Sequence, residues 1–193
     1  MIERFSERHL EEVVELHHRV LSWSINSRLG KAHIYNLYHT LLKDENAAGF
    51  VYITKDKVFG VVTGTLQYSQ TREKLESNYS FSDKFKLFFM MFNPKNAIYI
   101  LENVFLIPGF LKKNANIPGQ IITLVTDDNE AVRPFAAVKC FNAIKNFFSE
   151  NKLTEIFAQV ASFDLPPNNF YRKGLKLIPV KKYFRNYIYK IKI

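Results

Sequence analysis

The side chains that most often bind metal ions or act as nucleophiles are few in this sequence and are not grouped. The 193 residues contain five histidines and one cysteine. His17 and His18 are adjacent on a predicted helix, so their rings point in different directions. The other histidines lack metal-ligand spacing with a carboxylate or with Cys140; they are His9, His33 and His39. We therefore expect no metal site, histidines at helix surfaces or boundaries, and a buried, inert thiol at Cys140.

Sequence patterns of several other catalytic centres are absent too. There is no Gly-x-Ser-x-Gly, no cysteine pair and no phosphate-binding loop. One stretch is more informative. "NNFYRKGLKLI", residues 168–178, places Phe170 and Tyr171 before a basic turn with Gly174 and an apolar run. By itself it predicts a short helix that ends at a glycine and is followed by a strand.

The hydrophobic pattern around these residues predicts one α/β (α+β) domain over residues 1–193. Amphipathic helices are expected at 6–24 and after Gly30, followed by a hairpin with strands at 50–54 and 58–66. A strand, an acidic turn, a helix, a strand, a short helix and two closing strands follow at 119–126, 127–129, 136–148, 153–161, 166–174, 175–180 and 181–193. The order is ααββ, an insertion, then βαβαββ.

The insertion, residues 68–113, is expected to be helical. Its phenylalanines are spaced for one helical face before Pro94 ends the helix; they are Phe81, Phe85, Phe88, Phe89 and Phe92. Such a face could form core on the sheet, line a lid over an acceptor pocket, or dock on a membrane or a partner subunit. Core or lid is favoured, because Lys84 and Lys86 are too few to indicate an anionic bilayer.

The net charge of +9 is concentrated at the C-terminal end. From Arg172 onward the chain has eight basic residues and no Asp or Glu. Lysines that protect an exposed strand edge are the favoured interpretation, and an electropositive mouth for an acidic ligand is the alternative. Nucleic acid is not expected as a partner, because no recognition motif occurs and the basic residues alternate with apolar ones. The single cysteine and the charged N-terminal stretch favour a cytoplasmic protein.

The element order resembles that of the GNAT superfamily of acetyltransferases, which transfer an acyl group from acetyl-CoA to an amine. "GFVYITKDKVFGVVTGT" resembles the family's second and third strands with Gly60, and "SRLGKAHIYNLYHTLL" resembles the helix before them. "NNFYRKGLKLI" is similar to the family's late signature, with Tyr171 at its tyrosine and Gly174 at its glycine. The resemblance implies a mixed, mostly antiparallel twisted sheet flanked by helices, with a helical insertion between the third and fourth strands.

In this family a glycine-containing loop and the following helix hold the pyrophosphate of the cofactor. The corresponding stretch here, "VTDDNEAVRPFAAVKC", contains no glycine. The family's loop pattern can be aligned with it in two ways, starting at Arg133 or one residue earlier. The resemblance implies a binding site for acetyl-CoA made by Leu124, Val125, Arg133, Phe135, Ala136, Ala137, Val138 and Asp164. Asp127, Asp128 and Glu130 would repel a diphosphate, so Arg133 and Lys139 are expected to offset them.

The resemblance also implies that Tyr171 protonates the leaving thiolate. No general base is identified. Gln120 occupies the region where some members carry a glutamate, and Glu102, Asp164 and Glu155 are candidates without a motif. For Asp164 a helix-capping role beside Pro166 is the simpler interpretation.

Two functions follow. The first is an acyltransferase that acetylates a small-molecule amine, such as an amino sugar or a cell-surface precursor. The second is a degenerate GNAT-fold binding or assembly module without turnover. A basic module for RNA or an anionic membrane is a weaker third alternative, and a homodimer is compatible with each.

Overall fold

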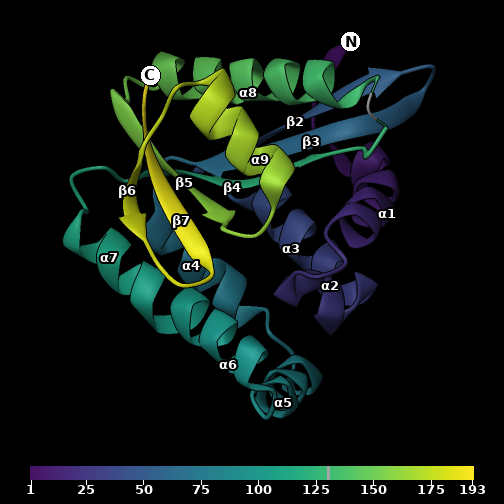
Figure 1. Cartoon of the computed structure of the whole chain (residues 1–193). Coiled ribbons are helices and arrows are strands. Elements are labelled where there is room, and N and C mark those ends of the chain that lie inside the picture. The colour runs from purple at the N-terminus through teal and green to yellow at the C-terminus, as the bar shows by residue number, and fades with distance from the viewer. Residues whose placement is uncertain (130) are drawn as a thin grey trace.

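The computed structural model describes residues 1–129 and 131–193, and within them seven strands form one sheet (Figure 1). The strand order is β1-β2-β3-β4-β5-β7-β6. The strands span Ile2–Arg4 (β1), Ala47–Thr54 (β2), Lys57–Thr65 (β3), Gly119–Thr126 (β4), Glu155–Ala161 (β5), Pro179–Lys182 (β6) and Asn186–Lys192 (β7). All neighbouring strands are antiparallel except β4 and β5, which are parallel. This mixed sheet with flanking helices confirms the predicted fold class.

Helices cover both faces of the sheet. Side chains alternate along β3, so Val61 packs in the cluster with α1 (Leu10–Val20) and α3 (Lys31–Lys43), and Val62 packs in the cluster with α8 (Arg133–Glu150). The short helices η1 (Glu7–His9) and α2 (Ile25–Leu29) flank α1. After β5 come α9 (Leu165–Asn169) and the π-helical turn η3 (Phe170–Gly174), both on the α8 side in Figure 1.

The two parallel strands pair over only a short length. Gly119, Gln120 and Ile121 of β4 face residues 156–158 of β5, and the pairing ends there. Beyond this point β4 continues along β3 to Thr126, while β5 pairs with β7 over all of Glu155–Ala161. Each strand is therefore held by its antiparallel neighbour, and the sheet opens between β4 and β5.

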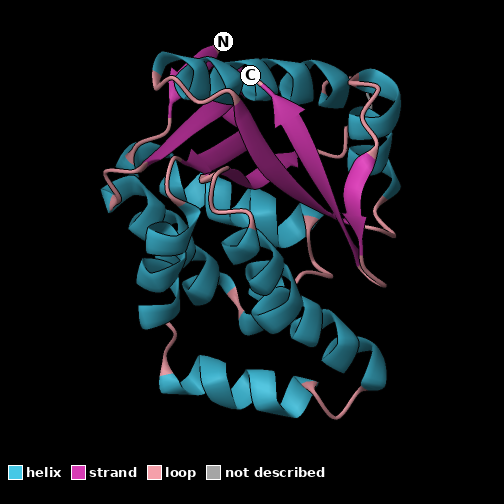
Figure 2. Cartoon of the chain, turned by 90° about the vertical axis from the view of Figure 1, so that its left-hand side faces the viewer, coloured by secondary structure: helices cyan, strands magenta, loops and turns pink. Residues whose placement is uncertain are grey.

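Residues 68–113 form the helices α4 (Tyr68–Ser77), α5 (Phe81–Met90), α6 (Pro94–Leu101) and α7 (Ile107–Lys113), with the π-helical turn η2 (Glu102–Leu106) before α7. Apolar contacts of α7 with Phe157 and Ile188 fasten this segment to β5 and β7. Polar contacts to Asp44 fasten α4, through Thr71 and through Lys74 Nζ at 2.6 Å. Figure 2 shows the outermost helix, α5, lying across the end of the molecule farthest from α8.

The prediction that the phenylalanine face of α5 forms core or lines a lid is wrong. Phe81 is 84% exposed and Phe92 is 72% exposed, and Phe85, Phe88 and Phe89 are also exposed. The reason is that α5 contacts the body through its opposite side. Asp83 lies 3.3 Å from His33 Nδ1, and Lys86 Nζ donates to the carbonyl of Leu29 at 2.8 Å.

The predicted closing strands also need a correction. Strand structure was expected over 175–180, but β6 begins at Pro179. Lys176 has a φ of 54°, which is incompatible with a strand. The edge interpretation of the C-terminal charge holds for two of the eight basic residues, because β6 is an edge strand with Lys181 and Lys182 exposed. The strand β1 and the helix α2 were not predicted.

We expect Gly64→Ala to destabilise the fold, because an added Cβ would lie 2.7 Å from Phe148 and 3.1 Å from the carbonyl of Gln120. Overpacking of this kind costs roughly 1–3 kcal/mol. The matched control is Gly109→Ala in α7, where an added Cβ has no atom of the described chain within 4 Å. Urea unfolding measures both free energies of unfolding. A Gly64→Ala value equal to that of the control would contradict the packing described for α8.

Candidate functional site

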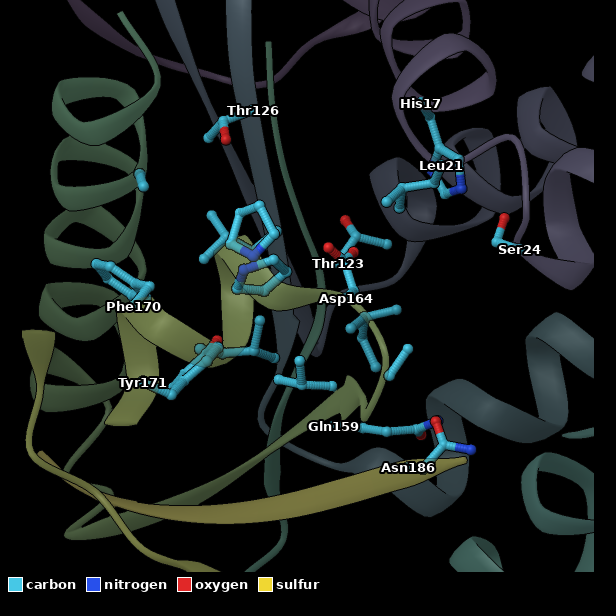
Figure 3. A pocket seen from close by; sticks show the side chains of 18 of the residues that line it. His17, Leu21, Ser24, Thr123, Thr126, Gln159, Asp164, Phe170, Tyr171 and Asn186 are labelled. Carbon is cyan, nitrogen blue, oxygen red and sulfur yellow. The ribbon is translucent and has the colours of Figure 1, made fainter. Parts of the chain in front are cut away.

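The opening between β4 and β5 leads into a cavity of about 470 Å³ (Figure 3). Its walls come from both strands, the first turn of α8, the α9–η3 segment and α1. Figure 3 shows Phe170 and Tyr171 on one side, His17 and Leu21 on the other, and Gln159 with Asn186 at one end. The volume lies in the range of sites for small molecules.

A second cavity of about 460 Å³ lies between α2, α3 and the helices α4–α6 with η2. The two cavities share lining residues: Ser24, Asn26, Tyr99, Asn103, Gln120, Ile122 and Gln159. Gln120 and Gln159 lie where β4 and β5 separate. Two ligands that enter from opposite sides can therefore meet at this junction.

The junction is lined by amide groups. Gln159 Nε2 donates to Asn103 Oδ1 at 2.7 Å and to Asn186 Oδ1 at 2.9 Å. Gln120 is buried, and its Oε1 has no partner in the described part of the chain, so it can accept a hydrogen bond from a ligand. Glu102 is buried beside this cluster and accepts from the N–H of Arg185 at 2.9 Å and from Asn186 Nδ2 at 2.7 Å. Its carboxylate therefore serves to hold β7 to η2.

Tyr171 lies in η3 and lines the first cavity, although it is only 2% exposed. Its ring stacks on Tyr189 with centroids 5.0 Å apart and meets Phe141 edge-on. Burial raises the pKa of its phenol well above the usual value. The hydroxyl is therefore protonated at neutral pH and can donate a proton or a hydrogen bond inside the cavity.

The structure places the eight predicted cofactor-binding residues in three settings. Leu124, Arg133, Ala137 and Asp164 line the first cavity. Val125 and Ala136 are buried in the core, where Ala136 packs against Gly60. Phe135 and Val138 are exposed and do not line the cavity. The helical period of α8 explains this, since positions 133 and 137 share one face and 135 and 138 lie on others.

Asp164 is the N-cap residue of α9, but the prediction that its side chain caps the helix is wrong. The N–H groups that a cap would bind belong to the second and third helical residues, and these are Pro166 and Pro167, which have none. The carboxyl group lines the cavity instead. Burial raises its pKa, against an opposing influence of Arg133. Asp164 is the one of the three candidate bases that lines the cavity. Glu155 lies outside it and pairs with Lys190 at 2.9 Å, and Glu102 is engaged with Arg185 and Asn186 as described above.

His17 is a cavity residue that sequence reasoning missed. It is 1% exposed, its Nδ1 lies 2.9 Å from the hydroxyl of Tyr38, and its Nε2 is buried without a partner within residues 1–129 and 131–193. Burial lowers its pKa to about 4, so the ring is neutral at pH 7. His9 and His33 are buried as well, so the expectation of surface or boundary histidines fails for three of five. The sequence did contain one signal. His17 lies four residues after Val13, a core residue, so the two side chains share one face of the helix.

Cys140 is buried as predicted, and burial raises the pKa of its thiol to about 12. Across residues 1–129 and 131–193, no group of three or more His, Cys, Asp or Glu side chains is arranged to hold a metal ion. No helix in the described chain has the length and apolar character needed to cross a membrane.

No protein-family model matches the chain, and no curated protein sequence matches it. Solved structures do. PaiA N-acetyltransferase from Thermoplasma acidophilum, in complex with coenzyme A, has a TM-score of 0.62 at 9% identity, with 100% of this chain and 98% of that chain covered. This chain has the GNAT fold. An aminoglycoside 6′-acetyltransferase type Ii gives 0.63 at 9% identity, covering 100% and 96%. The ribosomal-protein-S18-alanine N-acetyltransferase from Escherichia coli has a TM-score of 0.58 at 8% identity, with 100% of this chain and 93% of that chain covered.

The loop before α8, which contains no glycine, is held by charges that the sequence did not reveal. Arg19 of α1 pairs with Asp127 at 2.6 Å and with Asp128 at 2.7 Å. Arg133 donates to the carbonyl of Asp127 at 3.3 Å and to that of Asp128. Arg19 therefore neutralises the acidic turn, a role predicted for Arg133 and Lys139; Glu130 lies outside the described residues. Burial alone would raise the pKa of Asp127, but the N–H of Asn129 and Arg19 outweigh it and lower that pKa.

Replacing Arg19 with Met should destabilise this GNAT fold at neutral pH by about 1 kcal/mol, the upper range for a partly exposed pair. Because the folded-state pKa of Asp127 is depressed, its stabilisation is present above the unfolded pKa near 4 and is lost as pH falls through the folded value. The difference between wild type and Arg19→Met should therefore shrink between pH 7 and pH 3. Urea unfolding at both pH values measures it.

Lys31→Met is the control, because Lys31 and Glu15 form an exposed pair at 2.6 Å that should contribute little. Equal losses for the two variants at pH 7, or a pH-independent loss for Arg19→Met, would contradict the assigned role of Arg19.

Proposed function

We propose that this protein transfers an acetyl group from acetyl-CoA to the amine of a small polar acceptor. The observation that carries the proposal is the junction of two cavities at the point where β4 and β5 separate, with a buried, protonated Tyr171 in the wall. The backbone of β4 beyond Ile121 faces this opening and can bind the amide groups of a pantetheine arm, as another strand would.

The first turn of α8 can bind the diphosphate of the cofactor through the helix dipole and Arg133, without the glycines of the family's loop. The 18-residue helix directs its N-terminal dipole at the cavity, which favours an anion there. Phe135 falls at a glycine position of the family pattern when the pattern starts one residue before Arg133, and its side chain is exposed and does not line the cavity, so it leaves no bulky group there. Ala137 presents only a methyl group, and Arg133 supplies positive charge.

The proposed chemistry uses two side chains of the first cavity. The acceptor nitrogen attacks the thioester carbonyl, and the bond from carbon to sulfur breaks. The hydroxyl of Tyr171 gives its proton to the leaving thiolate, and the carboxylate of Asp164 accepts the proton that the amine loses, directly or through water. Proton exchange with solvent then restores both groups. Asp164 is chosen because it alone of the three candidate carboxylates lines the cavity.

The second cavity supports a hydroxylated amine, such as an amino sugar, as the acceptor. Its polar lining includes Asn36, Thr40 and Asn78, which can hydrogen-bond hydroxyl groups. Glu76 also lines it and can attract a cationic amine, although it pairs with Arg72 at 2.5 Å. An aminoglycoside acetyltransferase among the structural neighbours is consistent with an acceptor of this class.

One observation favours the second candidate, a GNAT-fold binding module without turnover. Several backbone donors of the loop are engaged within it: the N–H groups of Val132 and Arg133 bond the carbonyl of Asn129, and that of Ala131 bonds its side chain. These donors are then unavailable to a phosphate. Two measurements separate the candidates. Absence of acetyl-CoA binding at millimolar cofactor in calorimetry would exclude the enzyme, and acetylation of an amine that is lost in Tyr171→Phe would exclude the module.

Tyr171→Phe should bind acetyl-CoA as tightly as wild type but turn over roughly a hundredfold more slowly, because it removes only the proton donor. Calorimetry measures the binding, and release of free CoA with a panel of amino sugars and polyamines measures turnover. Tyr187→Phe, in the adjacent strand β7 and outside the cavity, is the matched control. Unchanged turnover in Tyr171→Phe would remove this residue from the mechanism.

Asp164→Asn should lose most activity while making the fold more stable at pH 7. The pKa of Asp164 is raised in the folded state, so folding favours its protonated form; the stabilisation is fully present below the unfolded pKa near 4 and is lost as the group ionises while pH rises through the folded value. Asparagine keeps the shape without the charge. Unfolding at pH 4 and pH 7 and the pH dependence of kcat/KM check both effects. A less stable variant at pH 7 would contradict the burial argument, and full activity would exclude Asp164 as the base.

A further inference from the structure

Helix α5 has the opposite orientation to an ordinary surface helix, with its polar side buried and its apolar side exposed. Its buried side is polar: Asp83 is 6% exposed and lies beside His33, and Lys86 reaches the carbonyl of Leu29. Its outward side carries the apolar side chains. A globular helix normally buries its apolar stripe, so this orientation leaves the stripe available for something outside the described chain.

The outward side chains form one continuous patch, which we call the aromatic face: Phe81, Phe85, Phe88, Phe89, Met91 and Phe92. Their rings contact one another along the helix, with centroids 4.6 Å apart for Phe85 and Phe89 and 5.4 Å apart for Phe88 and Phe92. All six side chains are exposed by 47% or more. Large apolar residues exposed singly are ordinary, but a contiguous group of this kind marks an interaction surface.

The exposed charges of the segment that carries the aromatic face have one sign. Residues 81–113 contain two acids, and both are buried: Asp83 against His33, and Glu102, which is 2% exposed. The exposed charged side chains of this segment are all lysines: Lys84, Lys86, Lys95, Lys112 and Lys113. A partner that covers the aromatic face therefore meets apolar rings on a segment whose exposed charges are all positive.

We propose that the aromatic face docks on an anionic lipid bilayer, with α5 lying in the plane of the headgroups. Phenylalanines that enter the acyl boundary while lysines contact anionic headgroups are the chemistry of interfacial helices. A second copy of the chain fits less well. In a twofold contact between identical faces, Lys84 and the other exposed lysines of residues 81–113 would approach those of the second copy without an exposed acid from the same segment.

The position of α5 suits this contact. It is the outermost helix in Figure 2 and crosses the end of the molecule away from α8, so its face can approach a flat surface without obstruction from the sheet. Lys84 and Leu87 of the same helix line the second cavity. Docking would hold that cavity next to the headgroups. Lipid binding needs none of the residues assigned to the transfer reaction, so it can be tested independently of activity.

The experiment is sedimentation of the purified chain with vesicles of phosphatidylcholine alone or mixed with phosphatidylglycerol. We expect binding to the mixed vesicles that weakens as salt is added and little binding to phosphatidylcholine alone. The double variant Phe85→Gln, Phe89→Gln should bind at least about tenfold more weakly, because two rings no longer enter the apolar region. Both side chains are exposed, so the variant should keep the fold, which circular dichroism and urea unfolding verify.

Charge-reversal variants separate binding to anionic lipid from nonspecific hydrophobic adsorption. Lys84→Glu with Lys95→Glu should abolish the preference for phosphatidylglycerol, whereas Lys57→Glu in the hairpin between β2 and β3 should not. Absence of binding to mixed vesicles, or wild-type binding by the double phenylalanine variant, would overturn the proposal. A dimer in sedimentation equilibrium that dissociates in the phenylalanine variant, without vesicle binding, would assign the face to a second copy instead.

Discussion

The separation of β4 from β5 is the constraint on which the rest of the site depends. Two parallel strands that pair over three residues would be a weak point of a sheet if each did not have a long antiparallel partner. Here β3 holds β4 and β7 holds β5, so the opening costs few hydrogen bonds overall. Both cavities, the first turn of α8 and the α9–η3 segment are arranged around that opening.

Two carboxyl groups near the first cavity illustrate how local partners set charge. Asp127 has Arg19 and the N–H of Asn129 as donors and is held ionised. Asp164 is followed by two prolines that offer no N–H, and burial makes its ionised form unfavourable. The same residue type is therefore held ionised by its donors in one place and has its ionised form disfavoured by burial in another.

The sequence predicted the elements whose signal is local. Strand 119–126 was predicted with its observed bounds, and Gly60 lies where its missing side chain lets Cys140 and Ala136 of α8 approach the sheet. The late stretch with Tyr171 was assigned a helix, and it forms α9 and η3. The left-handed conformation of Lys176, which ended a predicted strand early, leaves no clear trace in an apolar run.

The remaining features depend on tertiary contacts. The pairing of Arg19 with Asp127 joins residues 108 positions apart, and the local sequence around either residue does not predict it. The spacing of the phenylalanines predicted a one-sided helix, but a stripe that faces the core and one that faces outward have the same period. The contacts of Asp83 with His33 and of Lys86 with the carbonyl of Leu29 decide between them, and each joins α5 to another helix.

The burial of Cys140 has a practical consequence. It is the one thiol of the chain, and it lies in the core with 0% of its side chain exposed. The folded protein therefore presents no thiol to reagents in solution, and free CoA can be followed with thiol-reactive dyes without background from the protein. A cysteine introduced at any surface position would also be a unique attachment point for a fluorescent or spin label.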